Sequence, residues 1–177
     1  VKMADIVLNP DLQAREKLSR ENVEDYAEAY RTGAKMPALR LFHVADEYVL
    51  VDGFHRYNAM KRLGFEDTEA TIEAGSLADA MLAAAASNSR HGLRRTKGDA
   101  RRAAIIATNA LLKLNPRKRP TVDKVAELAG VGRSTVEAAF ADMTAAGVKL
   151  GAKDTRGRKA TVNVESETTH ETGTGEG

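Results

Sequence analysis

The sequence predicts an α+β protein that has a mixed α/β domain, a small all-helical domain and a disordered tail. Three observations lead to this fold class. Short strand-like apolar runs alternate with helical spacing up to about residue 87. From Thr96 to about Leu150 the apolar residues keep helical spacing. From Gly151 the chain is rich in glycine, threonine and charged residues and has little apolar content. The expected boundaries are 1–90, 91–150 and 151–177.

Composition narrows the class of protein. The chain has 177 residues, of which 42% are hydrophobic and 29% charged, as in an ordinary globular protein. It contains no cysteine, which excludes disulfides, cysteine-ligated zinc and thiol catalysis. No apolar run approaches the roughly 20 residues of a membrane span, and no signal-peptide core is present near the start. We expect a cytoplasmic protein without a membrane partner.

Charge is distributed unevenly along the chain. Residues 90–119 contain ten lysines and arginines and a single acid, Asp99. Residues 163–177 contain four glutamates and no lysine or arginine. The basic middle indicates a polyanionic partner, and the alternative is a solvated face. The tail adds a basic stretch, "KDTRGRKATV", similar to a minor-groove arm, before its acidic end, which we interpret as solubilising or self-shielding.

The N-terminal elements are predicted from the spacing of apolar residues and from the residues that form turns and helix caps. Residues 20–33 predict a helix that Gly33 ends. Residues 37–44 and 47–51 predict two strands, joined by a turn near Asp46–Glu47. A short helix over 55–63, a strand over 68–74 and a helix capped by Ser76 and Asp79 complete the expected domain.

The helical part begins with a second such cap. Thr96 and Asp99 precede a long helix that ends at Asn115–Pro116. After the linker "NPRKRP", Thr121 caps a short helix, and glycines at 130 and 132 separate it from another. We expect that last helix to begin at Ser134 or its neighbour and to bury three residues: Val136, Phe140 and Met143.

The stretch "LVDGFHRYNAMKRLG" is the first candidate site. Gly53 follows an apolar strand and permits a positive φ, and the helix after it exposes unpaired amides that attract anions. Arg56 offers a planar fork of donors that matches phosphate oxygens, and His55 lies beside it. The sequence therefore predicts a phosphate site. The alternative is that Arg56 bonds to a nearby acid and that His55 is a polar surface residue.

Three blocks resemble the ParB/sulfiredoxin superfamily over roughly residues 5–106. The first is "NPDLQAREKLSRENVEDYAEAYRTGAKMPALRLF", with its Gln-x-Arg, a helix, a glycine and a proline before a strand. The second is "VDGFHRYNAMKRLG", and the third is "AAAASNSRHGLRRTKGDARRAAI". Phe54 stands where sulfiredoxins carry their cysteine, so thiol-based sulfinic acid reduction is excluded.

The resemblance implies a nucleotide site. ParB proteins bind CTP at the glycine turn with a Glu-Asn pair near magnesium. On this chain the expected nucleotide-binding residues are Gly53, His55, Arg56, Asn88 and Arg90. Ser87 stands where the glutamate is expected, which removes a carboxylate that magnesium prefers. A related branch with an Asp-Gly-x-His-Arg turn phosphorylates free serine, and Asp52 would serve there as a base or metal ligand.

The segment "TVDKVAELAGVGRSTVEAAFADM" resembles a helix-turn-helix, whose second helix would lie in the major groove of DNA. The alternative is an ordinary pair of packed helices. Arginines and lysines nearby would contact phosphates, and polar residues near the start of the second helix would contact bases or phosphates. The expected DNA-binding residues are Arg94, Arg95, Lys97, Arg117, Lys118, Arg119, Arg133, Ser134, Thr135 and Glu137.

Together these features predict a bacterial DNA-binding protein of the ParB type. It would act in plasmid or chromosome partition or in transcription regulation, with CTP, together with magnesium, as a modulating ligand and a homodimer as its assembly. The alternative is a nucleotide-dependent enzyme on the same scaffold: a CTP or ATP hydrolase, a kinase or a nuclease. The four histidines show no ligand spacing, so we expect no resident metal site.

Overall fold

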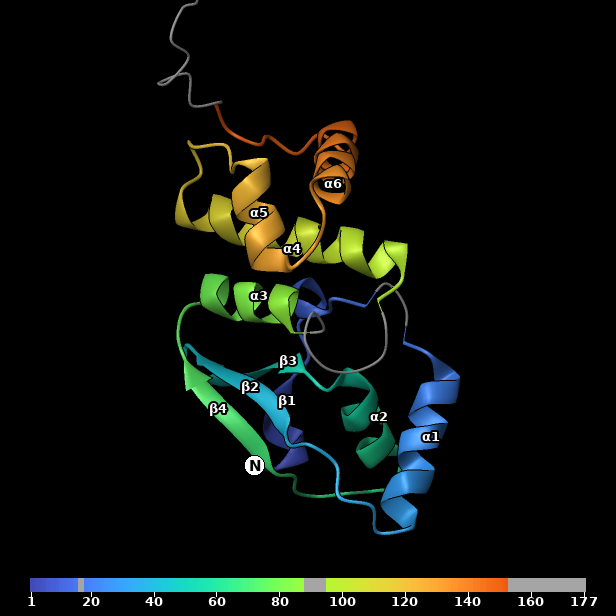
Figure 1. The fold of residues 1–177 in the computed structure, drawn as a ribbon. Helices are drawn as coiled ribbons and strands as arrows, with labels where there is room; N and C mark the ends of the chain where they lie inside the picture. Colours follow the sequence, from blue (N-terminus) through green and yellow to red (C-terminus); the bar gives the residue numbers. More distant parts are fainter. Residues whose placement is uncertain (16–17, 88–94, 153–177) are drawn as a thin grey trace, which may run out of the picture.

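The computed structural model describes residues 1–15, 18–87 and 95–152. A four-stranded sheet occupies the N-terminal part (Figure 1). Its strands are β1 (Ile6–Val7), β2 (Leu39–Val44), β3 (Glu47–Asp52) and β4 (Ala70–Ala74), in the order β1-β3-β2-β4. The central pair β2–β3 is antiparallel, whereas β1 and β4 are parallel to their neighbours.

The hairpin between β2 and β3 turns at Ala45 and Asp46, whose φ values are 45° and 69°. Two successive residues with positive φ make a turn whose twist matches that of the flanking strands. The predicted turn at Asp46–Glu47 is one residue late, because Glu47 already pairs with Val44 in the sheet.

The helices lie close to their predicted positions. The 3-10 helices η1 (Met3–Asp5) and η2 (Pro10–Leu12) flank β1. The α-helices are α1 (Arg20–Arg31), α2 (Phe54–Arg62), α3 (Leu77–Ala86), α4 (Lys97–Leu114), α5 (Val122–Ala129) and α6 (Arg133–Ala145). Both predicted capping boxes are present, at Ser76 and at Thr96, and Thr121 caps α5. Each supplies an acceptor to amides that the first turn leaves unpaired.

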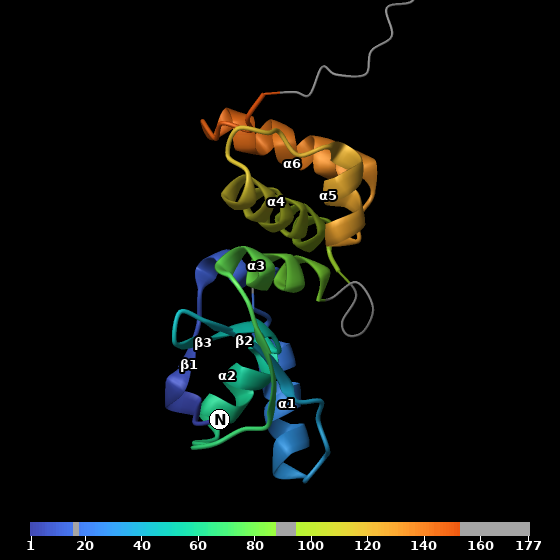
Figure 2. The same ribbon diagram turned by 90° about the vertical axis from the view of Figure 1, so that its left-hand side faces the viewer.

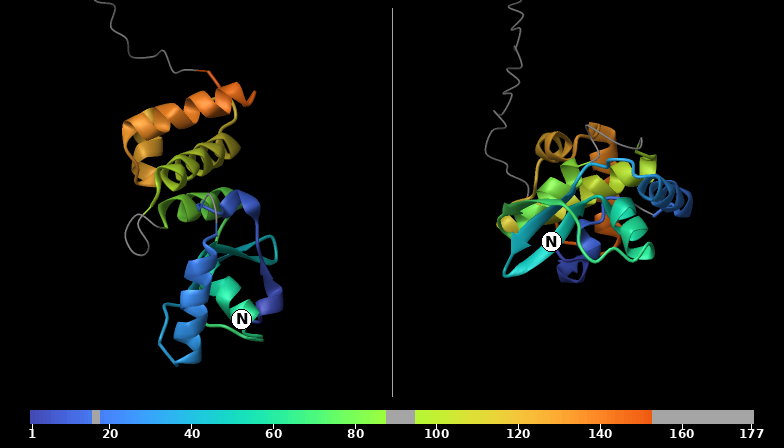
Figure 3. Two further views of the ribbon diagram at one scale, coloured as in Figure 1. Left: turned by 90° about the vertical axis from the view of Figure 1, so that its right-hand side faces the viewer. Right: turned by 90° about the horizontal axis from the view of Figure 1, so that it is seen from below.

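Helix α3 lies between the sheet and α4, and α5 and α6 pack on α4 (Figures 1 and 2). Helices α1 and α2 lie side by side next to the sheet, as the view from the right-hand side also shows (Figure 3, left). Helix α4 is therefore the centre of the helical part and its main contact with the α/β part, and α5 also packs on α3.

The buried core is continuous through these layers. It begins with sheet leucines such as Leu41 and Leu50, passes through Met81 of α3, and reaches Val125 and Val136 in α5 and α6. The buried alanines of α3 and α4 allow these helices to approach closely. The α+β fold class is confirmed, whereas the division at residue 90 stays a prediction. In the part of the chain that is described, no helix is both long and apolar enough to span a membrane, and the predicted tail beyond Ala152 lies outside it.

Candidate nucleic-acid interface and phosphate-binding turn

Glycine is required at the turn between β3 and α2. Gly53 has a φ of 99°, and a Cβ there would lie 2.6 Å from Leu39 Cδ2 and 3.0 Å from Arg56 Nη2. It is also the N-cap residue of α2 and provides no side-chain cap. The first amides of α2 therefore have no side-chain acceptor at this end, which is the geometry that favours an anion.

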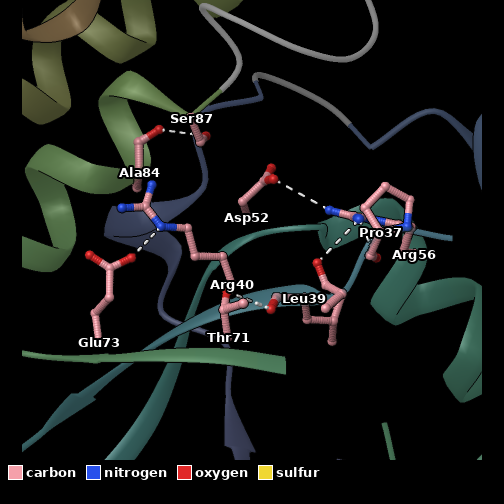
Figure 4. Close-up of polar contacts among 10 residues, drawn as sticks. Pro37, Leu39, Arg40, Asp52, Arg56, Thr71, Glu73, Ala84 and Ser87 are labelled. Carbon is pink, nitrogen blue, oxygen red and sulfur yellow. Dashed lines mark hydrogen bonds and ion pairs between the residues drawn. The ribbon is translucent and has the colours of Figure 1, made fainter. Parts of the chain in front are cut away.

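Arg56 lies inside the fold rather than in front of this turn. Its side chain is 11% exposed. Nη1 donates to the carbonyls of Pro37 and, at 3.3 Å, of Ala38, while Nη2 lies 3.3 Å from Asp52 Oδ2 (Figure 4). The guanidinium thus fixes the segment that leads into β2. Its ion pair with Asp52 matches the alternative considered for this residue above.

His55 is buried as well, and its Nε2 accepts a hydrogen bond from the Ser19 amide at 3.1 Å. Burial lowers the pKa of His55, and the Arg15 charge lowers it further, while Asp99 opposes both. A neutral imidazole is the form that can accept this bond. His55 therefore connects the start of α1 to α2, and the alternative of a polar surface histidine is wrong.

An ion pair joins the α/β part to the head of α4. Arg15 Nη1 lies 2.8 Å from Asp99 Oδ2, with both side chains largely buried. Asp99 also closes the capping box of α4. Arg102 donates to the carbonyls of Gln13 and, at 2.8 Å, of Pro10. Sequence analysis missed Arg15 as a site residue, although the Gln-x-Arg motif contains it.

Arg95 connects the ends of two helices. Its guanidinium donates to Ala85 O in the last turn of α3 at 2.6 Å and to Ala129 O at the end of α5 at 2.7 Å. Both carbonyls lie at helix ends, where acceptors lack helical partners. Burial lowers the pKa of Arg95, and the nearby Arg15 charge adds to this. Arg95, predicted as a DNA contact, is thus placed as a structural connection.

A concave basic surface lies where the starts of α4 and α6 meet. This cavity of about 790 Å³ is lined by Arg95, Thr96, Lys97, Gly98, Ala100, Arg101, Arg102, Ile105, Ser134, Thr135 and Ala138. We call it the basic hollow. Four of these described lining residues are cations and none is an acid. Arg101 pairs with Asp142 at 3.1 Å outside the lining, whereas Lys97 is exposed and forms no ion pair with the residues that the structure describes.

The two predicted short helices form around the glycines. Gly130 ends α5 with a φ of 61°, and Gly132 precedes α6. Val136, Phe140 and Met143 are buried, as predicted. Ser134 is exposed and Thr135 half-buried, and both line the basic hollow.

The remaining predicted DNA contacts lie elsewhere. Arg133 pairs with Asp123 at the surface, and Glu137 lines a separate groove beside Phe140. The guanidinium of Arg119 lies 5.1 Å above the Phe140 ring. Arg117 and Lys118 are exposed in the α4–α5 loop, whose backbone pairs with Ala152. Arg94, predicted to contact DNA, falls outside the described residues, as do Asn88 and Arg90, predicted to bind nucleotide.

A family model for the ParB N-terminal domain matches residues 1–89. The chain belongs to the ParB N-terminal domain family. The suspected ParB/sulfiredoxin relationship is therefore confirmed. A comparison with curated proteins finds no match.

Solved structures of ParB proteins share the fold. A pNOB8-like ParB N domain superposes with a TM-score of 0.57 at 14% identity, covering 80% of this chain and 67% of that one. Another structure of a pNOB8-like ParB N domain gives a TM-score of 0.52 at 16% identity, covering 80% and 63%. Truncated ParB from Caulobacter crescentus complexed with CTP-γ-S gives a TM-score of 0.47 at 20% identity, covering 79% and 74%.

Proposed function

We propose that this ParB-family chain binds duplex DNA through the basic hollow and the start of α6. The observation that carries the proposal is the lining itself, in which Lys97 and Arg101 lie exposed beside two hydroxyl residues of α6, with no acid among the described lining residues. Arg95 and Arg102 add positive charge while they donate to backbone carbonyls. Phosphate oxygens are the ligands that such a set recognises, because guanidinium, ammonium and hydroxyl groups all donate to them.

The start of α6 supports DNA as the ligand rather than a small anion. Ser134 and Thr135 lie on a helix that follows a glycine turn, and Gly132 provides no side-chain cap. In a helix-turn-helix the N-terminal residues of the second helix meet base edges in the major groove. Lys97 and Arg101 would then contact the adjacent backbone. Partition or transcription control in a bacterial cell is the role that we infer for such binding.

The test is fluorescence anisotropy with a labelled random duplex at several salt concentrations. Lys97→Ala should weaken binding and reduce the slope of log K against log salt by about 1, because one phosphate contact is lost. Ser134→Ala with Thr135→Ala should weaken binding further. Lys61→Ala is the matched control, because it removes another exposed lysine charge, from α2. Equal losses in the Lys61 and Lys97 variants would reject the hollow as the DNA site.

We also propose that the turn at Gly53 receives a nucleotide phosphate, with CTP as the first candidate. The uncapped head of α2 supports this, because its amides can bind an anion without moving Arg56. Asp52 lies beside the turn, but it pairs with Arg56. Among the described residues no group of three histidines or acids could hold a metal ion. Magnesium would therefore arrive coordinated mainly by the triphosphate.

Calorimetric titration with CTP and ATP, with and without magnesium, tests this second proposal. Arg56→Ala should weaken nucleotide binding, because the segment before β2 loses the donor that holds it beside the turn. Thermal unfolding of the same variant checks that it is folded. Identical titrations of the folded variant and the wild type would refute the assignment.

A further inference from the structure

The C-terminal acidic stretch and the basic hollow carry opposite charge, and the fold determines where the chain leaves toward that stretch. Ala152 accepts a hydrogen bond from the Arg119 amide at 3.0 Å and donates to Arg117 O at 3.2 Å. The chain after Ala152 therefore starts at the loop that follows the C-terminal end of α4. The four glutamates are Glu165, Glu167, Glu171 and Glu176.

The distances fit an intramolecular contact. The hollow lies at the opposite end of α4. A helix rises 1.5 Å per residue, so Lys97 and Lys113 lie about 24 Å apart along the axis of α4. The first glutamate follows Ala152 by 13 residues and the last by 24. A flexible coil of those lengths has a root-mean-square reach of about 20 to 27 Å. A linker whose reach matches the span gives an effective concentration on the order of millimolar.

The charge of the hollow favours the same contact. Arg95 and Arg102 donate to backbone carbonyls, and neither forms an ion pair with a carboxylate among the described residues. The charge of Asp99 nevertheless acts on Arg95. Lys97 is exposed at the same surface. A carboxylate in the hollow would thus meet the ammonium group of Lys97 and the positive charge of the neighbouring arginines, with no acid among the described lining residues.

We propose that the Glu165–Glu176 stretch binds the basic hollow of its own chain and competes there with DNA phosphates. The competition rests on the DNA-binding proposal, whereas the docking does not. The chemistry is that of a weak polyanion whose carboxylates occupy sites that phosphates would otherwise take.

Zero-length carbodiimide crosslinking of the full chain tests the docking, because it joins a carboxylate to an amine only when they are in contact. Mass spectrometry should find the four glutamates linked to Lys97, the one lysine of the described lining. A mixture with isotope-labelled chain separates links within one molecule from links between two. Links confined to Lys153 and Lys159 of the neighbouring basic stretch, or to a second copy, would overturn the proposal.

Duplex DNA separates the two proposals. Loss of the Lys97 links on adding duplex supports competition. If the links form and duplex neither binds nor removes them, the docking stands and the DNA-binding proposal fails.

Affinity for duplex provides the second readout. Changing all four tail glutamates to glutamine should tighten DNA binding about fivefold at low salt, with the gain disappearing as salt rises. The matched control removes four exposed acids from the α/β part: Glu21→Gln, Asp25→Asn, Glu47→Gln and Glu69→Gln. An equal gain in the control would show that net charge alone is responsible and would overturn the competition.

Discussion

Replacement of Arg95 by methionine should destabilise the whole fold. The change keeps most of the aliphatic length and removes two hydrogen bonds, at 2.6 and 2.7 Å, to carbonyls of α3 and α5. Hydrogen bonds to a charged group contribute about 1.5–3 kcal/mol each. Removing a guanidinium whose pKa is already lowered by burial recovers part of its desolvation cost. We therefore expect the free energy of unfolding to fall by about 2–4 kcal/mol.

Urea unfolding followed by far-ultraviolet circular dichroism measures this, since the chain has no tryptophan to report by fluorescence. Lys97→Met is the matched control, because Lys97 is an exposed cation two residues away. It should change stability by less than about 0.5 kcal/mol while weakening DNA binding. If Arg95→Met left stability unchanged and abolished DNA binding, Arg95 would be a DNA ligand and the structural role argued for it would be wrong.

Three further changes test the turns and the buried histidine. Gly53→Ala should lower the free energy of unfolding by about 2–4 kcal/mol in urea titrations, because the new Cβ would collide with a buried leucine of β2. Gly64→Ala is the control: there is open space around Gly64, so the change should cost only about 1 kcal/mol for its positive φ. Ala45→Gly should raise stability by about 0.5–1 kcal/mol, since alanine is strained at a φ of 45°; an unchanged urea midpoint would contradict this strain. The pKa of His55 is lowered in the fold, so the unfolded chain takes up a proton first as pH falls through about 6.5, and stability should decrease from pH 7.5 to 5.5. His55→Gln should flatten this profile, and an equally steep profile in that variant would assign the titration to another group.

Local patterns were sufficient to predict most elements. The spacing of apolar residues and the serine and threonine caps are short-range signals, so α3, α4 and α5 begin where Ser76, Thr96 and Thr121 indicate. The predicted hairpin turn was one residue late, because Ala45 has a positive φ, which alanine rarely adopts and which the sequence therefore does not predict.

The roles of the arginines could not be predicted in the same way. A guanidinium donates equally well to a phosphate and to a backbone carbonyl, so the sequence around Arg56 and Arg95 suits both outcomes. The structure directs both inward. The ion pair of Arg15 with Asp99 joins residues 84 positions apart, and no local spacing encodes such a contact. Lys97, Ser134 and Thr135 lie together on the hollow, and their role as DNA contacts stays a prediction.

The contacts of Arg95 also affect how cooperatively the protein unfolds. One side chain holds the end of α3, on one side of the expected boundary at residue 90, and the end of α5, on the other. A hinge at that boundary would have to break both bonds and expose the alanine-rich contact between α3 and α4. The two parts should therefore melt together in a single calorimetric transition, and a fragment ending near residue 90 should be a poor substitute for the intact chain.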